Sequence, residues 1–196
     1  MQVELLTSKE FIQEQENQAV RAMLICHANE DKQVVNQEAL TRIIKNKHYS
    51  ILEHISLKYE ISGLSRACLQ ELARHRHISL SVESTRYTLK KKINNEEWIM
   101  NYLNSLNDNQ NKIMQVFLGC AWSNPDMPND ELKYFLPEFW PMHLIMSVNV
   151  RALRDILDLR TSPAALKEFR VLCHELFNAV PDEFKYLLKD CVHEEV

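Results

Sequence analysis

The chain has very few glycines, and this limits the nucleotide-binding folds that it can adopt. Only two of its 196 residues are glycine, Gly63 and Gly119. The dinucleotide turn of the Rossmann fold and the P-loop both need several glycines within a few residues, because their backbones approach phosphate closely. The sequence therefore argues against a Rossmann dehydrogenase and against a P-loop NTPase. If the chain binds a dinucleotide, side chains and helix N-termini must hold its pyrophosphate.

The length and composition are typical of one globular domain. A chain of 196 residues can bury a sizeable core, and 45% hydrophobic with 26% charged residues is ordinary for such a domain. No apolar run is long enough to cross a membrane, and the first residues do not resemble a secretory signal. The net charge of −4 disfavours nucleic acid, so phosphate recognition must come from local clusters. We expect a single domain over residues 1–196 with no membrane or nucleic-acid partner.

The cysteines predict a reducing environment. The five of them are odd in number and widely spaced, at Cys26, Cys68, Cys120, Cys173 and Cys191. Such cysteines are typical of reduced, mostly buried thiols in a cytoplasmic protein.

Two histidines, His48 and His54, could in principle form a metal site, but their spacing suits neither one helix face nor a known loop site. We expect no metal.

Hydrophobic periodicity predicts a mixture of strands and helices. From Ile55 to Ile61 apolar and polar residues alternate, which is typical of a strand with one buried face. Residues 64–73 and 149–160 carry apolar residues at helical spacing. Asp130 can cap a further short helix.

Three other stretches have weaker patterns. Residues 139–148 are apolar, but Pro141 lies among them, so we expect an extended or edge segment rather than a central strand. Residues 77–84 and 86–89 alternate loosely and are predicted as strand or loop. Residues 94–111 are rich in asparagine and read as a variable connection with a short helix.

A cluster of cations is the most unusual local feature. Arg74, His75 and Arg76 are adjacent, and Ser84 and Arg86 follow a few residues later. Adjacent arginines repel each other, and their planar forks bind phosphate through paired hydrogen bonds. The stretch therefore predicts a site for a phosphorylated ligand. A solvated basic turn and a nucleic-acid patch are the alternatives.

Three blocks of the sequence resemble one enzyme family. Arg-His-Arg at 74–76, seven residues and then Ser84 is similar to the signature of the flavin-dependent thymidylate synthases, as is the following Ser-Thr-Arg-Tyr. Residues 48–54, HYSILEH, resemble a second family block, and residues 149–160, NVRALRDILDLR, resemble a third. On its own the third block is better explained as an amphipathic helix with i,i+4 ion pairs, such as Arg151 with Asp155 and Arg154 with Asp158. The three blocks occur in the family's order and span roughly half of the chain.

The resemblance implies a fold, an assembly and a reaction. The fold would be α+β, an antiparallel sheet flanked by helices, assembled as a homotetramer with active sites at subunit interfaces. The reaction would be the reductive methylation of dUMP to dTMP, with FAD as cofactor. The carbon donor would be 5,10-methylenetetrahydrofolate, and NADPH would reduce the flavin.

The resemblance also implies site residues. FAD would lie against His48, Ser50, Arg74, His75, Arg76, Asn149, Arg151 and Asp155. The nucleotide dUMP would lie against Glu71, Arg74, Ser84, Arg86 and Lys133, with Arg160 beside the pyrimidine. Arg160 would be the catalytic residue, since a fixed cation can stabilise negative charge that develops on the ring. Ser84 has no evident base and orienting acid around it, so we assign it to binding.

Three positions depart from the family pattern. Glu71 stands where many members have Gln, Val82 where many have Glu, and Asp155 where Asn or His is common. A carboxylate is unfavourable beside a phosphate, so we expect Glu71 to face a sugar hydroxyl or Arg74.

Two other functions remain open at this stage. One is a non-catalytic oligomer that binds nucleotides or nucleic acid through the basic stretch. The other is a structural oligomer with a decayed site.

Overall fold

The structure is a computed structural model that describes residues 1–29 and 31–193. Within these residues the centre is one antiparallel sheet with the strand order β1-β2-β4-β3. In chain order the strands are β1 (Gln2–Leu5), β2 (Ser56–Ser65), β3 (Ile78–Val82) and β4 (Pro141–Asn149). The predicted α+β class with an antiparallel sheet is confirmed.

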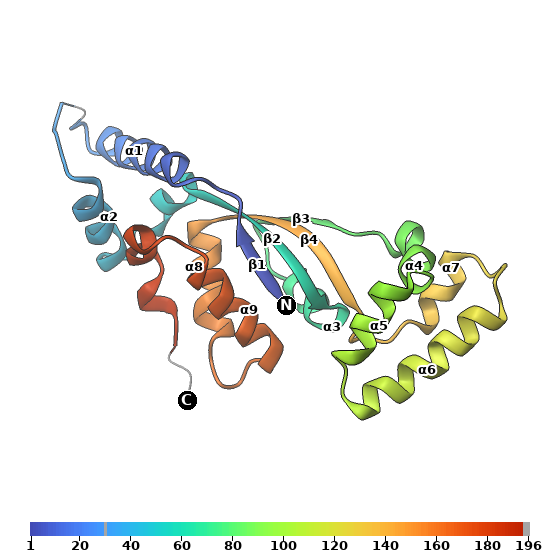
Figure 1. Cartoon of the computed structure of the whole chain (residues 1–196). Helices are drawn as coiled ribbons and strands as arrows, with labels where there is room; N and C mark the ends of the chain where they lie inside the picture. Colours follow the sequence, from blue (N-terminus) through green and yellow to red (C-terminus); the bar gives the residue numbers. More distant parts are fainter. Residues whose placement is uncertain (30, 194–196) are drawn as a thin grey trace.

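The helices lie at both ends of the sheet and against one of its faces (Figure 1). The α-helices are α1 (Lys9–Cys26), α2 (Asn36–Lys45), α3 (Arg66–Leu72), α4 (Thr85–Ile93), α5 (Glu96–Asn104), α6 (Asp108–Ser123), α7 (Asn129–Leu132), α8 (Val150–Arg160) and α9 (Lys167–Asn178). Short 3-10 helices are η1 (Tyr49–His54), η2 (Lys133–Phe135), η3 (Asp182–Leu187) and η4 (Lys189–Cys191).

One face of the sheet is apolar because the side chains along each strand alternate. In β2, Leu57, Tyr59 and Ile61 are all buried. Tyr59 lies opposite Met146 of β4, which lies opposite Leu80 of β3. Cross-strand apolar neighbours on one face stabilise each other, and α8 and α9 belong to the same buried cluster. The strand predicted from this alternation is confirmed.

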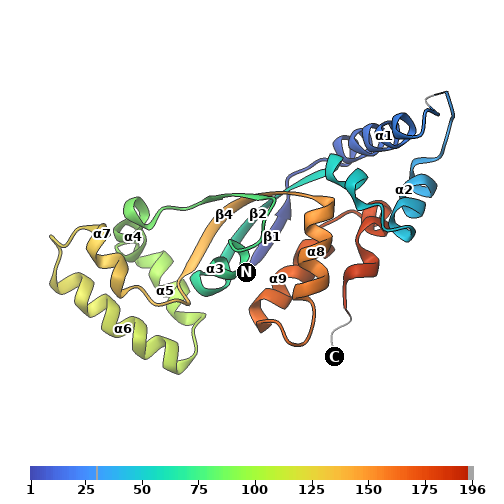
Figure 2. The ribbon, with the colours of Figure 1, turned by 180° about the vertical axis from the view of Figure 1, so that it is seen from behind.

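A second hydrophobic cluster holds helices α4 to α7 together at the far end of the sheet from α1 and α2 (Figure 2). Its centre is Trp140, which is 1% exposed and whose ring centroid lies 5.3 Å from that of Trp98 and 5.5 Å from that of Tyr102. Because Trp140 directly precedes β4, the cluster attaches these helices to the sheet. We call α4 to α7 the helical lobe.

The prediction of an edge segment over residues 139–148 is wrong. β4 is a central strand that pairs with β2 on one side and with β3 on the other. Pro141 is tolerated because it is the first residue of the strand, where proline is accepted in sheets.

The helical lobe is also more regular than the sequence predicts. Residues 86–89 lie in α4, not in a strand or loop, and this helix buries Leu89 and Ile93 one turn apart. Residues 94–111 contain all of α5 and the first turn of α6. Asparagine caps start both helices, and such caps are the local signal that could have revealed them.

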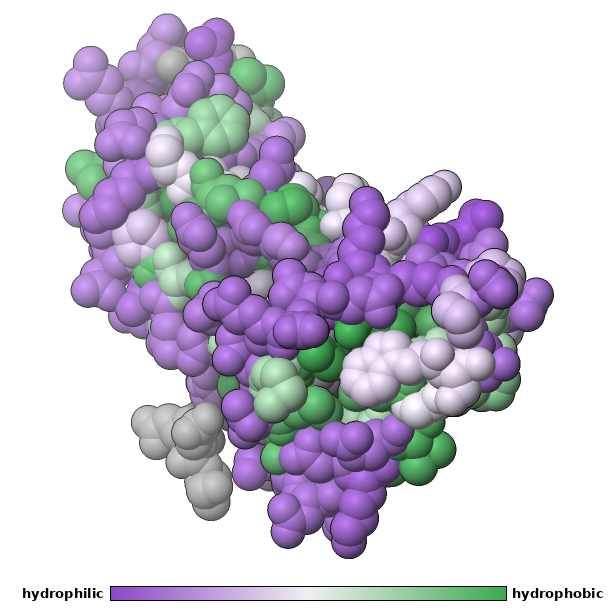
Figure 3. Space-filling model, turned by 45° about the vertical axis from the view of Figure 1, so that its right-hand side comes forward, coloured by the Kyte–Doolittle hydropathy of each residue, from purple (hydrophilic) through white to green (hydrophobic). Residues whose placement is uncertain are grey.

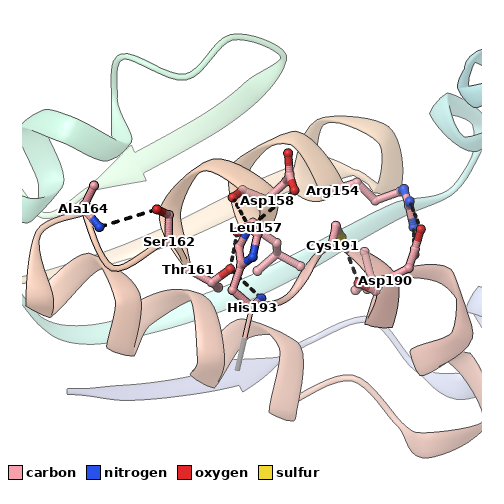
Figure 4. A network of polar contacts seen from close by, with 10 residues as sticks. Arg154, Leu157, Asp158, Thr161, Ser162, Ala164, Asp190, Cys191 and His193 are labelled. Atoms are coloured by element: carbon pink, nitrogen blue, oxygen red, sulfur yellow. Dashed lines mark hydrogen bonds and ion pairs between the residues drawn. The ribbon is translucent and has the colours of Figure 1, made fainter. Parts of the chain in front are cut away.

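Polar contacts tie the C-terminal segment to α8 (Figure 4). Arg154 is buried, and its two terminal nitrogens donate to the carboxylate of Asp190, each at 2.7 Å. Nearby, the backbone N–H of His193 donates to the hydroxyl of Thr161 at 2.9 Å. Arg154 therefore pairs across the fold with Asp190, in place of the i,i+4 pair with Asp158.

Replacing Asp190 with asparagine should lower the free energy of unfolding by about 2 kcal/mol near neutral pH, because the buried guanidinium of Arg154 loses its counter-charge. The hydrogen bond from Arg154 holds the pKa of Asp190 below its usual value. A lowered carboxyl pKa stabilises the fold above the unfolded pKa of about 4, and this contribution is lost as the pH falls through the folded pKa.

Denaturant titrations of wild type and variant at a series of pH values test this expectation. The difference between the two proteins should shrink toward acid. Asp182, whose side chain is 91% exposed in its pair with Lys185, offers the control. Asp182→Asn should leave the free energy of unfolding unchanged, because exposed ion pairs contribute little to stability. A difference for Asp190→Asn that is the same at acid and neutral pH would contradict the proposed ion pair.

The remaining sequence expectations concern cysteines, membranes and metals. All five cysteines are free, and Cys68, Cys173 and Cys191 are buried. Every helix in residues 1–29 and 31–193 is too short or too polar to cross a membrane. Over the same ranges no group of three or more His, Cys, Asp or Glu side chains could hold a metal ion.

Candidate active site

Arg160 lies at the centre of a cluster that joins α8, α3 and α9. Its Nη1 donates to the Glu71 carboxylate at 2.7 Å, and its Nε donates to Nε2 of His75 at 3.1 Å. The guanidinium carbon lies 4.8 Å from the ring centroid of Phe169, a distance at which a cation is attracted to an aromatic face. The Arg160 side chain is 20% exposed. Arg160 is thus held by three neighbours and still reaches solvent.

The contact with Arg160 determines the protonation of His75. Nε2 of His75 accepts a hydrogen bond and so carries no proton. Burial, followed by the nearby charge of Arg160, lowers the pKa of His75 below its usual value. The imidazole is therefore neutral near neutral pH, with its proton on Nδ1.

The Glu71 carboxylate pairs with Arg160, whereas its contact with Arg74 is a backbone hydrogen bond at the end of α3, so the predicted side-chain pairing with Arg74 is wrong. The carboxylate comes from α3 and the guanidinium from the last residue of α8, and both helices pack against α9. The pair offsets the positive charge of Arg160 in the free protein. A negatively charged ligand group that uses Arg160 must share it with Glu71 or replace Glu71.

Glu168 fixes the base of this cluster. Its carboxylate accepts hydrogen bonds from the backbone N–H of Ser65 at 2.8 Å and from the Ser65 hydroxyl. Ser65 ends β2 and caps α3, so α9, which carries Phe169, is anchored to the start of the helix that carries Glu71. Burial raises the pKa of the nearby Cys68 thiol to about 12, which keeps it protonated and unreactive.

A cavity of about 370 Å³ lies where β4 ends and α8 begins. Its lining residues are Glu53, His77, Asn149, Arg151, Ala152 and Asp155. It brings together three predicted flavin contacts: Asn149, Arg151 and Asp155. The Asn149 side-chain oxygen caps α8 by accepting from the N–H of Ala152 at 2.8 Å, so the cap does not use its amide nitrogen. Arg151 pairs with Glu53.

His48 and Ser50 lie outside this cavity. His48 precedes η1 and lines a separate cavity of about 520 Å³ between α1 and α2, together with Lys32 and Arg42. Ser50 lies on η1 and is exposed. The short helix η1 thus has a residue of one cavity, His48, just before it and carries a residue of the other, Glu53.

Ser84 and Arg86 stand at the N-terminal end of α4. Ser84 is the N-cap residue, and its hydroxyl makes no capping hydrogen bond. The free N–H groups and the dipole of a helix N-terminus favour an anion. Arg86 Nε lies 2.8 Å from the carboxylate of Asp130, and the same oxygen lies 3.3 Å from Nζ of Lys133. The fold thus brings together Arg86 and Lys133, two of the predicted nucleotide contacts.

Arg74 and Arg76 follow the C-terminal end of α3, and both side chains are exposed. That end of a helix disfavours an anion, so these arginines can bind phosphate only through their outward tips. His77 comes next and has a φ of 62°, in the left-handed region. This conformation, which is uncommon for a residue other than glycine, turns the chain from the arginines into β3.

Three residues that shape the site were not predicted: Phe169, Glu53 and Asp130. No sequence motif identifies Phe169, which reaches Arg160 only through the packing of α9 on α8. Glu53 lies inside the second family block and could have been found there. Asp130 was expected to cap a helix, but α7 begins at Asn129 and Asp130 lies inside it.

Comparison with known sequences gives consistent similarities. The family described as "Thymidylate synthase complementing protein" matches residues 5–184 of this chain. The chain is 38% identical over 188 residues to a flavin-dependent thymidylate synthase of Campylobacter jejuni (strain RM1221), covering 87% of this chain and 86% of that protein. It is 42% identical over 168 residues to the flavin-dependent thymidylate synthase of Wolinella succinogenes, covering 77% of this chain and 78% of that protein.

Comparison with solved structures gives the same result. A crystal structure of thymidylate synthase X from Helicobacter pylori with FAD and dUMP superposes with a TM-score of 0.80 at 34% identity. The match covers 99% of this chain and 100% of that chain. A second structure of the Helicobacter pylori enzyme, also complexed with FAD and dUMP, gives a TM-score of 0.81 at 33% identity.

Proposed function

Because the chain belongs to the family of flavin-dependent thymidylate synthases, we propose that it binds FAD and dUMP and catalyses the reductive methylation of dUMP to dTMP. In this proposal 5,10-methylenetetrahydrofolate donates the carbon and NADPH reduces the flavin. Both assignments follow from the family resemblance. A cytoplasmic location stays a prediction.

The observation that carries the proposal is the arrangement around Arg160. Methylation at C5 of uracil requires negative charge at C5, and this charge is shared with the ring oxygens and N3. Arg160 is always charged and is oriented by Glu71, His75 and Phe169. A preorganised cation facing O2, N3 or O4 stabilises that charge without reorganising during the reaction.

We assign the nucleotide phosphate to the N-terminus of α4. Ser84 offers a hydroxyl that its helix does not use, and Arg86 and Lys133 offer two cations. Lys133 would act as a point charge, whereas the fork of Arg86 can donate two parallel hydrogen bonds. Glu71 and Arg160 then face the pyrimidine.

We assign the flavin to the cavity at the start of α8 and to the exposed arginines beside it. The donor set fits a dinucleotide: Arg151, Arg74 and Arg76 are cations for its phosphates, and the Asn149 amide can donate to a ring or sugar. The Glu53 and Asp155 carboxylates can accept from hydroxyl groups. When bound, reduced FAD supplies the hydride that amino-acid side chains cannot. The residues of this chain bind and orient the two ligands and exclude water between them.

We further infer a homotetramer with sites at subunit interfaces. The flavin cavity is near the small end of ligand pockets, which span about 300–1,000 Å³, so FAD must extend beyond it. Several large hydrophobic side chains of residues 85–136 are exposed, including Val116 at 76% and Tyr134 at 82%. Figure 3 is turned so that the right-hand side of Figure 1 comes forward, and it shows hydrophobic surface (green) on that side. Such patches mark interfaces, and a solution mass near four times 23.1 kDa is expected.

The absorption spectrum of the purified protein tests the function. After incubation with FAD and desalting, the protein should keep flavin absorbance, NADPH should bleach it, and dTMP should form when dUMP and methylenetetrahydrofolate are added. An Arg151→Ala variant should retain much less flavin, roughly tenfold less at limiting FAD, because it loses the cation that lines the cavity.

The control is Arg21→Ala, since Arg21 is an exposed arginine on α1. This variant should retain flavin as wild type does. A colourless wild-type protein that binds dUMP would favour the non-catalytic nucleotide-binding alternative. A protein that binds neither ligand would favour a structural oligomer.

A further inference from the structure

Asp130 occupies an unusual place between two of the cations assigned to the nucleotide phosphate. One oxygen of its carboxylate lies 2.8 Å from Arg86 Nε and accepts a hydrogen bond from Lys133 Nζ at 3.3 Å. The two nitrogens can therefore be no more than about 6 Å apart. Two like charges at this separation repel each other. Asp130 is the group that allows them to lie together before any ligand arrives.

The contact uses only one edge of Arg86. The carboxylate of Asp130 approaches the Nε side of the guanidinium, and the two terminal nitrogens form a different edge of the same planar group. The fork formed by those nitrogens is the part of arginine that suits phosphate. Asp130 therefore orients Arg86 from its Nε side, whereas a phosphate would use the edge formed by the terminal nitrogens.

The neighbouring residue holds the backbone of Arg86. The side-chain amide nitrogen of Asn129 donates to the carbonyl oxygen of Arg86 at 2.7 Å. Asn129 and Asp130 are the first two residues of α7, and α7 packs against α4. The start of α7 thus contacts both the main chain and the side chain of Arg86.

The charge state of Asp130 agrees with this role. Desolvation acts to raise its pKa, but the hydrogen bonds from Arg86 and Lys133 outweigh it and hold the pKa below its usual value. The carboxylate therefore stays ionised at the pH values at which the enzyme would work.

We propose that Asp130 is a positioning residue for the nucleotide phosphate, which it serves by holding Arg86 and Lys133 in one place at the N-terminus of α4. This inference rests on the proposed function, since it takes a phosphorylated nucleotide as the ligand. A flexible arginine and a flexible lysine each lose rotamer freedom when they bind a ligand. Asp130 orders both before binding, so less of that cost falls on the binding step.

The test compares Asp130→Ala, Asp130→Asn and wild type, all loaded with FAD. Calorimetry with dUMP should show affinity about tenfold weaker for the alanine variant, the loss expected when two long side chains must be ordered on binding. The asparagine variant keeps an oxygen that can accept from Arg86 and should recover part of the loss. Inhibition by deoxyuridine, which lacks the phosphate, should be unchanged in all three proteins.

Two comparisons separate positioning from a general effect on the fold. Asp182→Ala removes another Asp–Lys pair at i,i+3 spacing, remote in sequence from the site, and should leave dUMP affinity unchanged. In an Arg86→Ala background, Asp130→Ala should weaken dUMP binding by only about twofold, because one of its two partners is already gone.

The outcomes distinguish this inference from the proposed function. Unchanged or tighter dUMP binding in Asp130→Ala would overturn the inference, and tighter binding would show that Asp130 competes with phosphate. Equal losses for dUMP and deoxyuridine would also overturn it, since Asp130 would then act on the whole site. Wild-type protein that binds FAD but no dUMP would overturn the proposed function, and this inference with it.

Discussion

Replacing Arg160 with alanine should lower kcat for dTMP formation by about a hundredfold to a thousandfold, while FAD stays bound. This is the size of effect seen when one preorganised donor to a developing negative charge is removed. Arg160 is the only residue assigned here to charge on the pyrimidine, and its contacts with Glu71, His75 and Phe169 orient it before substrate binds. Steady-state kinetics measure the effect, with flavin content and solution mass recorded for each variant.

Two further variants make this prediction specific. Arg160→Lys keeps the charge but loses the planar fork and the Nε donor to His75, so kcat should fall by a smaller factor, about tenfold. Arg170→Ala is the control, because Arg170 lies on the neighbouring α9 and donates to the carbonyl oxygen of Pro163 at 2.8 Å. The kcat of Arg170→Ala should equal that of wild type. Arg160→Ala with kcat within about fivefold of wild type would refute the catalytic role of Arg160.

Replacing Trp140 with alanine should lower the free energy of unfolding by about 4 kcal/mol, the usual cost of removing a large buried aromatic side chain. Trp140 is 1% exposed and contacts the rings of Trp98, Tyr102 and Phe117. It also joins the helical lobe to β4, so the lobe should loosen first. Because Arg86 and Asp130 lie in that lobe, dUMP affinity should fall more than FAD affinity.

Urea titrations and ligand binding measure both effects. Trp122 offers the matched control, since it is the same residue type in the same lobe but is 53% exposed. Trp122→Ala should lower the free energy of unfolding by much less than Trp140→Ala does, because its ring is not packed inside the cluster. If the two tryptophan variants lose similar stability, the helical lobe is not anchored through Trp140.

Local patterns in the sequence correctly predict those helices and strands whose buried residues repeat at regular spacing within one element. Alternation around Tyr59 correctly predicts β2, and helical spacing around Leu153 correctly predicts α8. Both patterns repeat over several residues on one face, so a single element reveals them. The edge assignment for residues 139–148 fails because pairing with β2 and β3 is a property of three separate segments.

In the candidate site, too, residues of one local motif were predictable and contacts between distant segments were not. Asn149, Arg151 and Asp155 share the start of one helix, so a single motif identifies all three. The partners of charged residues are harder to predict. Helical spacing suggested Asp158 as the partner of Arg154, and the fold supplies Asp190. The Glu71 carboxylate was expected to face a sugar hydroxyl or Arg74, and the fold pairs it with Arg160.

The sequence by itself determined that this chain has no glycine turn for nucleotide phosphates and carries clustered arginines in the order of one enzyme family. Residue types and short spacings are enough for those conclusions. Only the tertiary structure decided that Glu71, His75 and Phe169 surround Arg160, and that Asp130 holds Arg86 beside Lys133. The physical reason is that ion pairs and ring contacts act over a few ångströms, and residues far apart in the chain reach that distance only when helices pack together.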